Sequence, residues 1–280
     1  MTKNPLEIPE ILTLVGMNLP IWHYSVVGIY LFQPKEMLSC LQVSHHFRNT
    51  LLPILWYTFD EKAMAKVPVD IIRKYTPYFR VHHNYGHQQA YPTNNREPCT
   101  NLIQLTMSTR HDVLDRHDIA YINNNPGLRL LGGSYLIQVN TVYADTFTNL
   151  RRLNHLDIQL ESRNRQYHRE LLQPISTTLT SLRLVGLKGP LGLRELVFPN
   201  LKELHPRLSH PQDMQDLLQG CPYLEAIIED PLPPQITLHL IHCLKSGICP
   251  VLRNLRSNVY RDQMEDFSEM LENRSGLQML

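Results

Sequence analysis

A short leucine motif that recurs over the last two thirds of the chain constrains the fold most strongly. The motif is Leu-x-x-Leu, once ending in Ile, and it begins at Leu102, Leu128, Leu153, Leu179, Leu201, Leu224, Leu252 and Leu277. The spacings between first leucines are 26, 25, 26, 22, 23, 28 and 25 residues, with a mean of 25. So regular a spacing predicts that one structural unit is repeated along this part of the chain.

Between the motifs the apolar residues recur at a helical period. The first such segment follows Ser209, the second contains Leu238, Ile241 and Leu244, and the third follows Asp262. Gly220, Gly247 and Gly276 follow their last apolar positions. The segments Ser209–Gln212 and Asp262–Glu265 have the form of capping boxes. One strand and one helix every 25 residues lies within the range of leucine-rich repeats and predicts an α/β solenoid of about seven to eight repeats over residues 99–280. An irregular α/β domain is the alternative fold.

The second variable position of each motif, and the alternate positions after it, should face away from the leucines along one face of the strands. Candidate target-binding residues on this concave face are Gln104, Thr106, His155, Asp157, Ser181, Arg183, Glu203, His205, Asn254 and Arg256. They are polar and of mixed sign, which is typical of a protein-binding surface. Ordinary solvated strand residues would give the same pattern.

Residues 4–56 have a different character and predict a small helical module. Asn4-Pro5 is a helix start signal and Pro20 a stop, so the first helix is expected between them. Residues 21–34 are expected to form a long apolar loop. A second helix should follow Pro34, and Pro53 should start a short turn that ends at Leu55-Trp56.

This stretch resembles an F-box, the helical module that docks substrate receptors onto the Skp adaptor of SCF-type ubiquitin ligases. Ile8-Pro9 stands where the family has Leu-Pro, Val43 to Arg48 matches its Val-Cys-Arg-x-Trp-Arg segment, and Leu55-Trp56 matches its closing Leu-Trp. It departs from the family at Ile11, where many members have Glu, and in the length of loop 21–34. The resemblance implies adaptor binding through Leu6, Ile8, Pro9, Leu38, Leu41, Val43, Phe47 and Trp56.

Residues 57–98 read as a linker or transition. A short helix is expected over 67–75, closed by Pro77, followed by a short strand over 78–81. The polar segment from His82 to Pro98 is expected to be an exposed loop.

Composition excludes several classes of protein. Apolar residues make up 42% and charged residues 19% of the 280, so the chain can bury a sizeable core. The formal net charge of +1 gives no support for nucleic acid or an anionic membrane as a partner. The sequence contains five scattered cysteines and shows no secretory signal. It also has no apolar run long enough to span a bilayer, and together these features favour the cytoplasm or nucleus. Cys99, Cys221 and Cys249 each precede a motif leucine by three residues and should be small buried residues.

No motif for nucleotide binding or nucleophilic catalysis is present, so we expect neither a cofactor nor catalysis. His82, His83 and His87 are interpreted as a solvated loop rather than a metal site. Arg110–Asp112 and Arg116–Asp118 are expected on the polar side of a helix. Arg151, Arg152, Arg163 and Arg165, interleaved with Asp157 and Glu161, are interpreted as a solvated face.

The expected fold is α+β: a helical F-box-like module followed by a leucine-rich-repeat solenoid. The resemblance implies a non-catalytic receptor of an SCF-type cullin–RING ligase, with a Skp-type adaptor and through it a cullin scaffold as partners, and an unknown protein as target. One alternative is a leucine-rich scaffold with no ligase role, whose N-terminal helices only cap the solenoid. The other is an enzyme on an irregular α/β fold, which predicts a deep pocket with convergent titratable groups.

Overall fold

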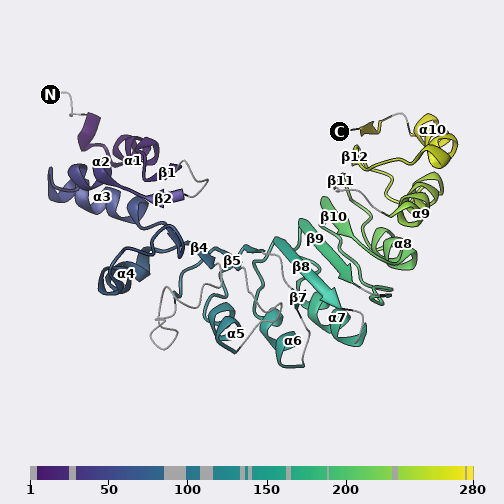
Figure 1. The fold of residues 1–280 in the computed structure, drawn as a ribbon, viewed down its shortest axis with the longest axis horizontal. Coiled ribbons are helices and arrows are strands. Elements are labelled where there is room, and N and C mark those ends of the chain that lie inside the picture. The colour runs from purple at the N-terminus through teal and green to yellow at the C-terminus, as the bar shows by residue number, and fades with distance from the viewer. Residues whose placement is uncertain are drawn as a thin grey trace. The chain divides into compact units, whose positions relative to one another are not determined.

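The computed structural model describes residues 5–24, 30–84, 99–107, 116–132, 136–137, 141–161, 165–187, 189–228, 233–274 and 276–279. The chain divides into two compact units, Met1–Thr106 (unit 1) and Met107–Leu280 (unit 2). Each unit contains helices and parallel neighbouring strands, so the fold is α+β, as predicted (Figure 1).

The first α-helix of unit 1 begins later than the sequence suggested. A 3₁₀ turn (η1, Pro5–Glu7) precedes helix α1 (Pro9–Asn18), and Ile8 between them is extended, with φ −90° and ψ 113°. A residue before proline is disfavoured in the helical region, so Pro9 sets the start of the helix. The same effect ends it: Leu19, before Pro20, is extended with ψ 134°.

The expected loop 21–34 contains a β-hairpin instead. Strands β1 (Trp22–Tyr24) and β2 (Tyr30–Phe32) pair antiparallel, with Trp22 opposite Phe32. The rings of this pair lie 5.3 Å apart, and Phe32 lies 5.6 Å from the ring of Trp56. Burial against Trp56 therefore explains why this connection is apolar.

Two helices, rather than one, follow Pro34. Helix α2 (Lys35–Cys40) and helix α3 (His45–Leu55) are separated at Ser44, whose hydroxyl accepts a hydrogen bond from the backbone N–H of Phe47 at 3.2 Å. A serine cap of this kind starts a new helix. Helix α3 continues through Pro53 to Leu55, so the turn expected at Pro53 is wrong.

The described part of 57–98 packs within unit 1. It forms β3 (Thr58–Asp60), α4 (Val69–Tyr75), a 3₁₀ turn (η2, Thr76–Tyr78) and β4 (Val81–Asn84), and β5 (Gln104–Met107) lies beside β4. The expected strand at 78–81 is therefore displaced to Val81–Asn84. Tyr75 stacks on Trp56 at 4.6 Å and Phe79 stacks on Phe59 at 5.0 Å, which gives unit 1 an aromatic core.

The strands of unit 2 begin inside the predicted motifs. They are β6 (Leu130–Gly132), β8 (His155–Glu161), β9 (Ser181–Leu187), β10 (Glu203–Arg207), β11 (Ala226–Ile228), β12 (Asn254–Arg256) and β13 (Gln278–Met279). They lie side by side in chain order, and β7 (Leu136–Ile137) pairs with β8. All these pairings are parallel.

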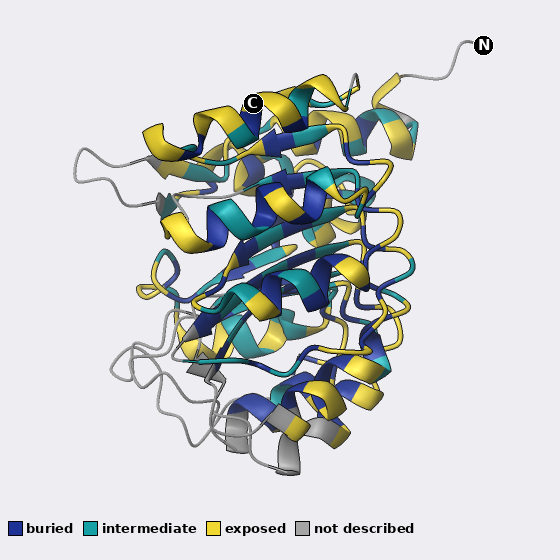
Figure 2. Ribbon diagram, turned by 90° about the vertical axis from the view of Figure 1, so that its right-hand side faces the viewer, coloured by how far each residue is buried: buried dark blue, intermediate teal, exposed yellow. Residues whose placement is uncertain are grey.

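Helices return the chain between most of these strands, but residues 189–202, between β9 and β10, form no helix, which departs from the predicted repeat of one strand and one helix. The helices are α5 (Arg116–Asn123), α6 (Thr141–Thr148), α7 (Arg165–Leu172), α8 (Pro211–Gln219), α9 (Pro234–Lys245) and α10 (Met264–Glu272), with 3₁₀ turns η4 (Gln173–Ile175) and η5 (Arg261–Gln263). Figure 1 shows these helices along one side of the strands, and Figure 2 shows that they carry buried and exposed residues on different sides. The motif leucines Leu153, Leu156, Leu179 and Leu182 are fully buried beneath them. Each such side chain stabilises the fold by about 1.5–3 kcal/mol.

Helix ends in unit 2 differ from the capping boxes that the sequence suggested. Helix α8 starts at Pro211 with His210 as its N-cap, and no side chain caps α8 or α10. Proline at the first helical position already lacks the N–H that a cap would bind. Gly247, in contrast, has φ 85° and ends α9 in the left-handed region that favours glycine, as predicted.

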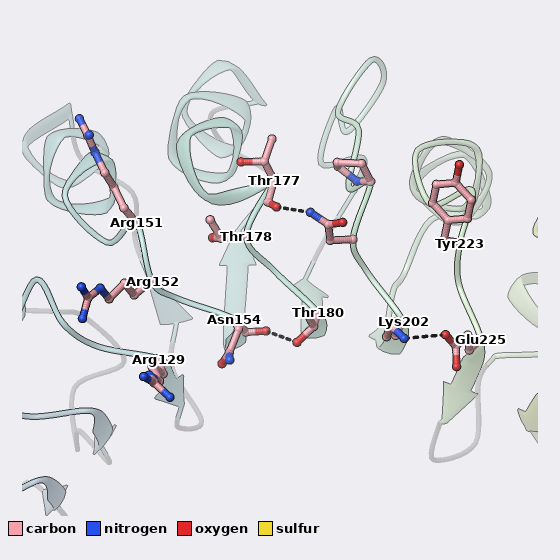
Figure 3. Close-up of a pocket in the computed structure, with 12 residues that line it drawn as sticks. Arg129, Arg151, Arg152, Asn154, Thr177, Thr178, Thr180, Lys202, Tyr223 and Glu225 are labelled. Carbon is pink, nitrogen blue, oxygen red and sulfur yellow. Dashed lines mark hydrogen bonds and ion pairs between the residues drawn. The ribbon is translucent and has the colours of Figure 1, made fainter.

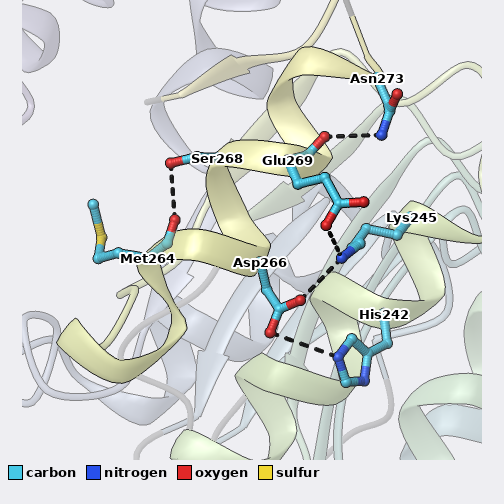
Figure 4. Close-up of polar contacts among 7 residues, drawn as sticks. All are labelled: His242, Lys245, Met264, Asp266, Ser268, Glu269 and Asn273. Atoms are coloured by element: carbon cyan, nitrogen blue, oxygen red, sulfur yellow. Dashed lines mark hydrogen bonds and ion pairs between the residues drawn. The ribbon is translucent and has the colours of Figure 1, made fainter.

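An ion-pair cluster links the last two described helices of unit 2. Lys245 of α9 donates to Asp266 of α10 at 2.9 Å and to Glu269 at 2.5 Å, and the His242 ring lies 3.9 Å from Asp266 (Figure 4).

The predicted burial of the cysteines before the motif leucines is confirmed, since Cys99, Cys221 and Cys249 are at most 4% exposed.

Candidate protein-binding surfaces

Helix α1 turns one side toward α3 and the other toward solvent. A side-chain carbon added at Gly16 would lie 2.5 Å from Cδ2 of Leu51, so glycine permits the close approach of the two helices. Leu12, one turn before Gly16, is fully buried. The opposite side of α1 therefore has no partner among the described residues of unit 1, although it is apolar.

That opposite side carries large exposed apolar side chains. Leu14 is 62% exposed and Met17 is 66% exposed. Beside them is an apolar cleft of about 410 Å³, lined by Ile11, Leu14, Val15, Asn18 and Leu19. A contiguous apolar surface exposed to water is unusual on a folded protein and is typical of an interaction site.

The predicted adaptor-binding residues divide into exposed and buried groups. Leu6 is 40% exposed, Leu38 46% and Val43 65%, and Pro9 is exposed, so these four are available to a partner. Ile8 and Phe47 are half-buried. Leu41 and Trp56 are 8% and 5% exposed and contribute to the core of unit 1. A sequence match alone could not separate these groups, because it does not show which side of each helix packs inward.

Strand alternation places the predicted target-binding residues of unit 2 in two rows. His155, Ser181 and Glu203 occupy the same register on β8, β9 and β10, and the next row contains Asp157, Arg183 and His205. Asn254 and Arg256 lie on β12. All eight are half-buried or exposed, while the residues between them are buried. Gln104 and Thr106 are half-buried on β5.

The two rows form a polar surface with charges of both signs. Arg183 lies 3.7 Å from Asp157, and His205 Nε2 lies 2.5 Å from the carboxylate of Glu203. Burial lowers the pKa of His155 below its ordinary value, opposed by the nearby Asp157 and Glu203 carboxylates. A neutral imidazole offers one donor and one acceptor, which suits hydrogen bonding to a protein surface.

The interpretation of His82 and His83 as part of a solvated loop is wrong, because both lie on strand β4, and the interpretation of Asp118 also requires correction. His82, expected in a solvated loop, is 3% exposed on β4, and its Nε2 lies 3.3 Å from Glu61. His87 lies outside the described residues, as do Arg110–Asp112. Asp118, expected on a polar helix side, is only 6% exposed on α5. No group of three potential metal ligands occurs in the described part of the chain.

The predicted arginine face is also divided by the structure. Arg151 and Arg152 precede β8, whereas Arg165 opens α7 after that strand, and Arg163 lies outside the described residues. The seven residues of β8 extend over about 20 Å, which separates the arginines before the strand from Arg165 after it. Asp157 therefore does not interleave with Arg151 and Arg152, because it lies on the face of β8 and not at its beginning.

Among the helices that the structure describes, none has the length and apolar character required to cross a lipid bilayer. A scan against protein-family models and a search of curated proteins gave no match to this chain.

Proposed function

We propose that the chain is a non-catalytic substrate receptor of an SCF-type ubiquitin ligase, in which an F-box-like unit 1 binds a Skp-type adaptor and a leucine-rich-repeat solenoid in unit 2 binds a target protein. The observation that carries the proposal is the exposed apolar surface of α1 and its neighbours. Leu14 and Met17 are 62% and 66% exposed, and exposed apolar side chains of this kind favour an external partner.

The receptor would act by proximity. Its partners would supply the ubiquitin-transfer chemistry, and holding a target beside them raises the effective concentration of the target's lysines. The mixed-charge rows on β8, β9 and β10 suit this role, because they offer donors, acceptors and both signs of charge. In the hairpin β1–β2, Phe32 packs on Trp56, which belongs to the core of unit 1.

Co-purification with a Skp-type adaptor tests the proposal. The variant Pro9→Asp with Leu38→Asp introduces two carboxylates at exposed positions. Aspartate in the first turn of α1 is compatible with the helix dipole, so folding should be retained. We expect adaptor binding to fall at least about tenfold, because each buried unpaired charge in an interface is costly.

The matched control carries the same charge change at Val197 and Val251, which are 51% and 39% exposed in unit 2. Val197→Asp with Val251→Asp should bind the adaptor like the unaltered chain. Absence of adaptor binding by the unaltered chain would refute the receptor function and favour a scaffold without a ligase role.

A further inference from the structure

In the six Leu-x-x-Leu motifs of unit 2 that begin at Leu128 to Leu252, the first variable position lies directly before a strand, and these positions form a row. The backbone N–H of Asn154 donates to the carbonyl of Arg129 at 2.9 Å, and that of Thr180 to Asn154 at 2.8 Å. The next two bonds run from Lys202 to Thr180 and from Glu225 to Lys202, both at 2.9 Å. The row therefore crosses the amino ends of the parallel strands.

This row is the floor of an open groove of about 770 Å³. The turns between helices and strands form its side, with Arg151, Arg152, Thr177 and Tyr223 among the lining residues (Figure 3). Short hydrogen bonds join neighbouring turns along the side of the groove. Asn200 donates to the Thr177 carbonyl at 2.6 Å, and the Thr178 hydroxyl to the Leu153 carbonyl at 2.6 Å.

The groove is strongly cationic although the chain is nearly neutral. Four basic side chains and one acidic side chain line it, a net charge of +3 (four minus one) against +1 for the whole chain. Glu225 pairs with Lys202 at 2.9 Å. Arg129, Arg151 and Arg152 are exposed, and none has a carboxylate partner among the described residues. The positive charge is therefore concentrated at the end of the groove where β6 and β8 begin.

We propose that this groove binds an extended, acidic peptide segment of a partner protein, with Arg129, Arg151 and Arg152 binding its carboxylates. Guanidinium groups bind carboxylates through two parallel hydrogen bonds, which gives geometric selectivity as well as attraction. The inference rests on the proposed receptor function in one respect: it takes the peptide to be the segment by which the target is recognised. Binding of the peptide to the chain is a property that can be measured without the adaptor.

The length of the groove fits a short peptide. Neighbouring strands lie about 4.8 Å apart, so the three intervals from Arg129 to Lys202 span about 14 Å. An extended peptide advances about 3.3–3.6 Å per residue, so about four residues cover that distance. Tyr223, which is 62% exposed, lies beyond Lys202 and offers an aromatic surface to the next side chain of the peptide.

Fluorescence anisotropy with labelled hexaglutamate and the full chain tests the proposal. The triple variant Arg129→Gln, Arg151→Gln, Arg152→Gln should weaken binding at least about tenfold. The control Arg169→Gln, Arg194→Gln, Arg261→Gln removes equal charge from exposed positions of unit 2 that lie outside the groove and outside the predicted target-binding residues, and it should change binding less than about twofold. Circular dichroism checks that both variants are folded.

A second variant should act in the opposite direction. Glu225→Gln removes the partner of Lys202 and lengthens the cationic part of the groove, so hexaglutamate should bind more tightly, by about two- to threefold. Hexaglutamine should not bind. An equal loss in both triple variants, no change or weaker binding with Glu225→Gln, or no binding of hexaglutamate at all would overturn the proposal.

Two further measurements make the result specific. A single-stranded DNA oligonucleotide of equal charge should bind more weakly than hexaglutamate, and tighter DNA binding would overturn the assignment to an acidic peptide. The groove variants should still co-purify with the Skp-type adaptor. Loss of peptide binding with adaptor binding intact, or the reverse, therefore distinguishes failure of this inference from failure of the proposed function.

Discussion

Single side chains in this protein owe their properties to partners that adjacent sequence does not reveal. His82 is buried because β3 pairs with β4, which places it opposite Phe59 and within 3.3 Å of Glu61. The polar residues around it in sequence suggested a loop. His155 and Glu203, in contrast, could be assigned to one face from strand alternation alone, since their leucine neighbours mark the buried side.

His155 should make stability depend on pH. Burial lowers its pKa below the ordinary 6.5, outweighing the attraction of Asp157 and Glu203, and His205 lowers it further. The unfolded chain then binds a proton that the folded chain resists, so this contribution is complete above pH 6.5 and is lost as pH falls through the folded pKa. His155→Gln should therefore lose less stability than the unaltered chain between about pH 7.5 and about pH 5 in urea unfolding. An identical pH dependence in both proteins would contradict this expectation.

At the scale of elements, the sequence predicted strands better than helix ends. Each predicted motif in unit 2 contains the start of a strand, because the second leucine and the variable residue before it mark the buried and open faces of that strand. Capping boxes were predicted at Ser209 and Asp262 but do not form. The α1 start was misplaced because two prolines, Pro5 and Pro9, compete for the first position, and only the second is followed by continuous helix.

Helix α8 also holds a loop through one buried carboxylate. Asp213 is 1% exposed and accepts hydrogen bonds from the backbone N–H of Leu191 at 2.8 Å and of Gly192 at 3.2 Å. Asp213→Ala leaves both donors without an acceptor and should lower the free energy of unfolding by about 2–4 kcal/mol. Asp213→Asn keeps one oxygen able to accept both bonds and should cost less. Urea unfolding of the two variants measures the difference, and equal losses would argue against the role of the hydrogen bonds.

At the scale of the whole molecule, the two units can be followed by different signals. Both tryptophans, Trp22 and Trp56, belong to unit 1, so tryptophan fluorescence reports on that unit. Leu182 is fully buried in unit 2 and Leu51 in unit 1. Leu182→Ala should lower stability by about 2–5 kcal/mol and shift the far-ultraviolet circular dichroism transition more than the fluorescence transition. Leu51→Ala should shift fluorescence more. Equal shifts of both signals in both variants would indicate one cooperative unit.

The sequence anticipated a helical beginning and a repeating strand-and-helix remainder. It did not anticipate β1–β2, β3 or the aromatic packing on Trp56, because these depend on pairing between segments with no repeated pattern. The cationic groove was also missed, although a signal exists: the residue after the first leucine of each motif. Read as one column, these residues include Arg129, Lys202 and Arg253.

The residues of that column contribute to recognition, whereas the leucines beside them contribute to folding. The side chains of the column lie outside the leucine core. Substitutions in the column therefore change the charge and the hydrogen-bonding groups of the groove, while the strands and helices beneath it stay the same. Gain or loss of one motif would change the length of the groove in steps of about 4.8 Å, or about one and a half residues of extended peptide. Proteins built in this way can therefore change their binding partner either by substitutions in the column or by a change in groove length, at little cost in stability.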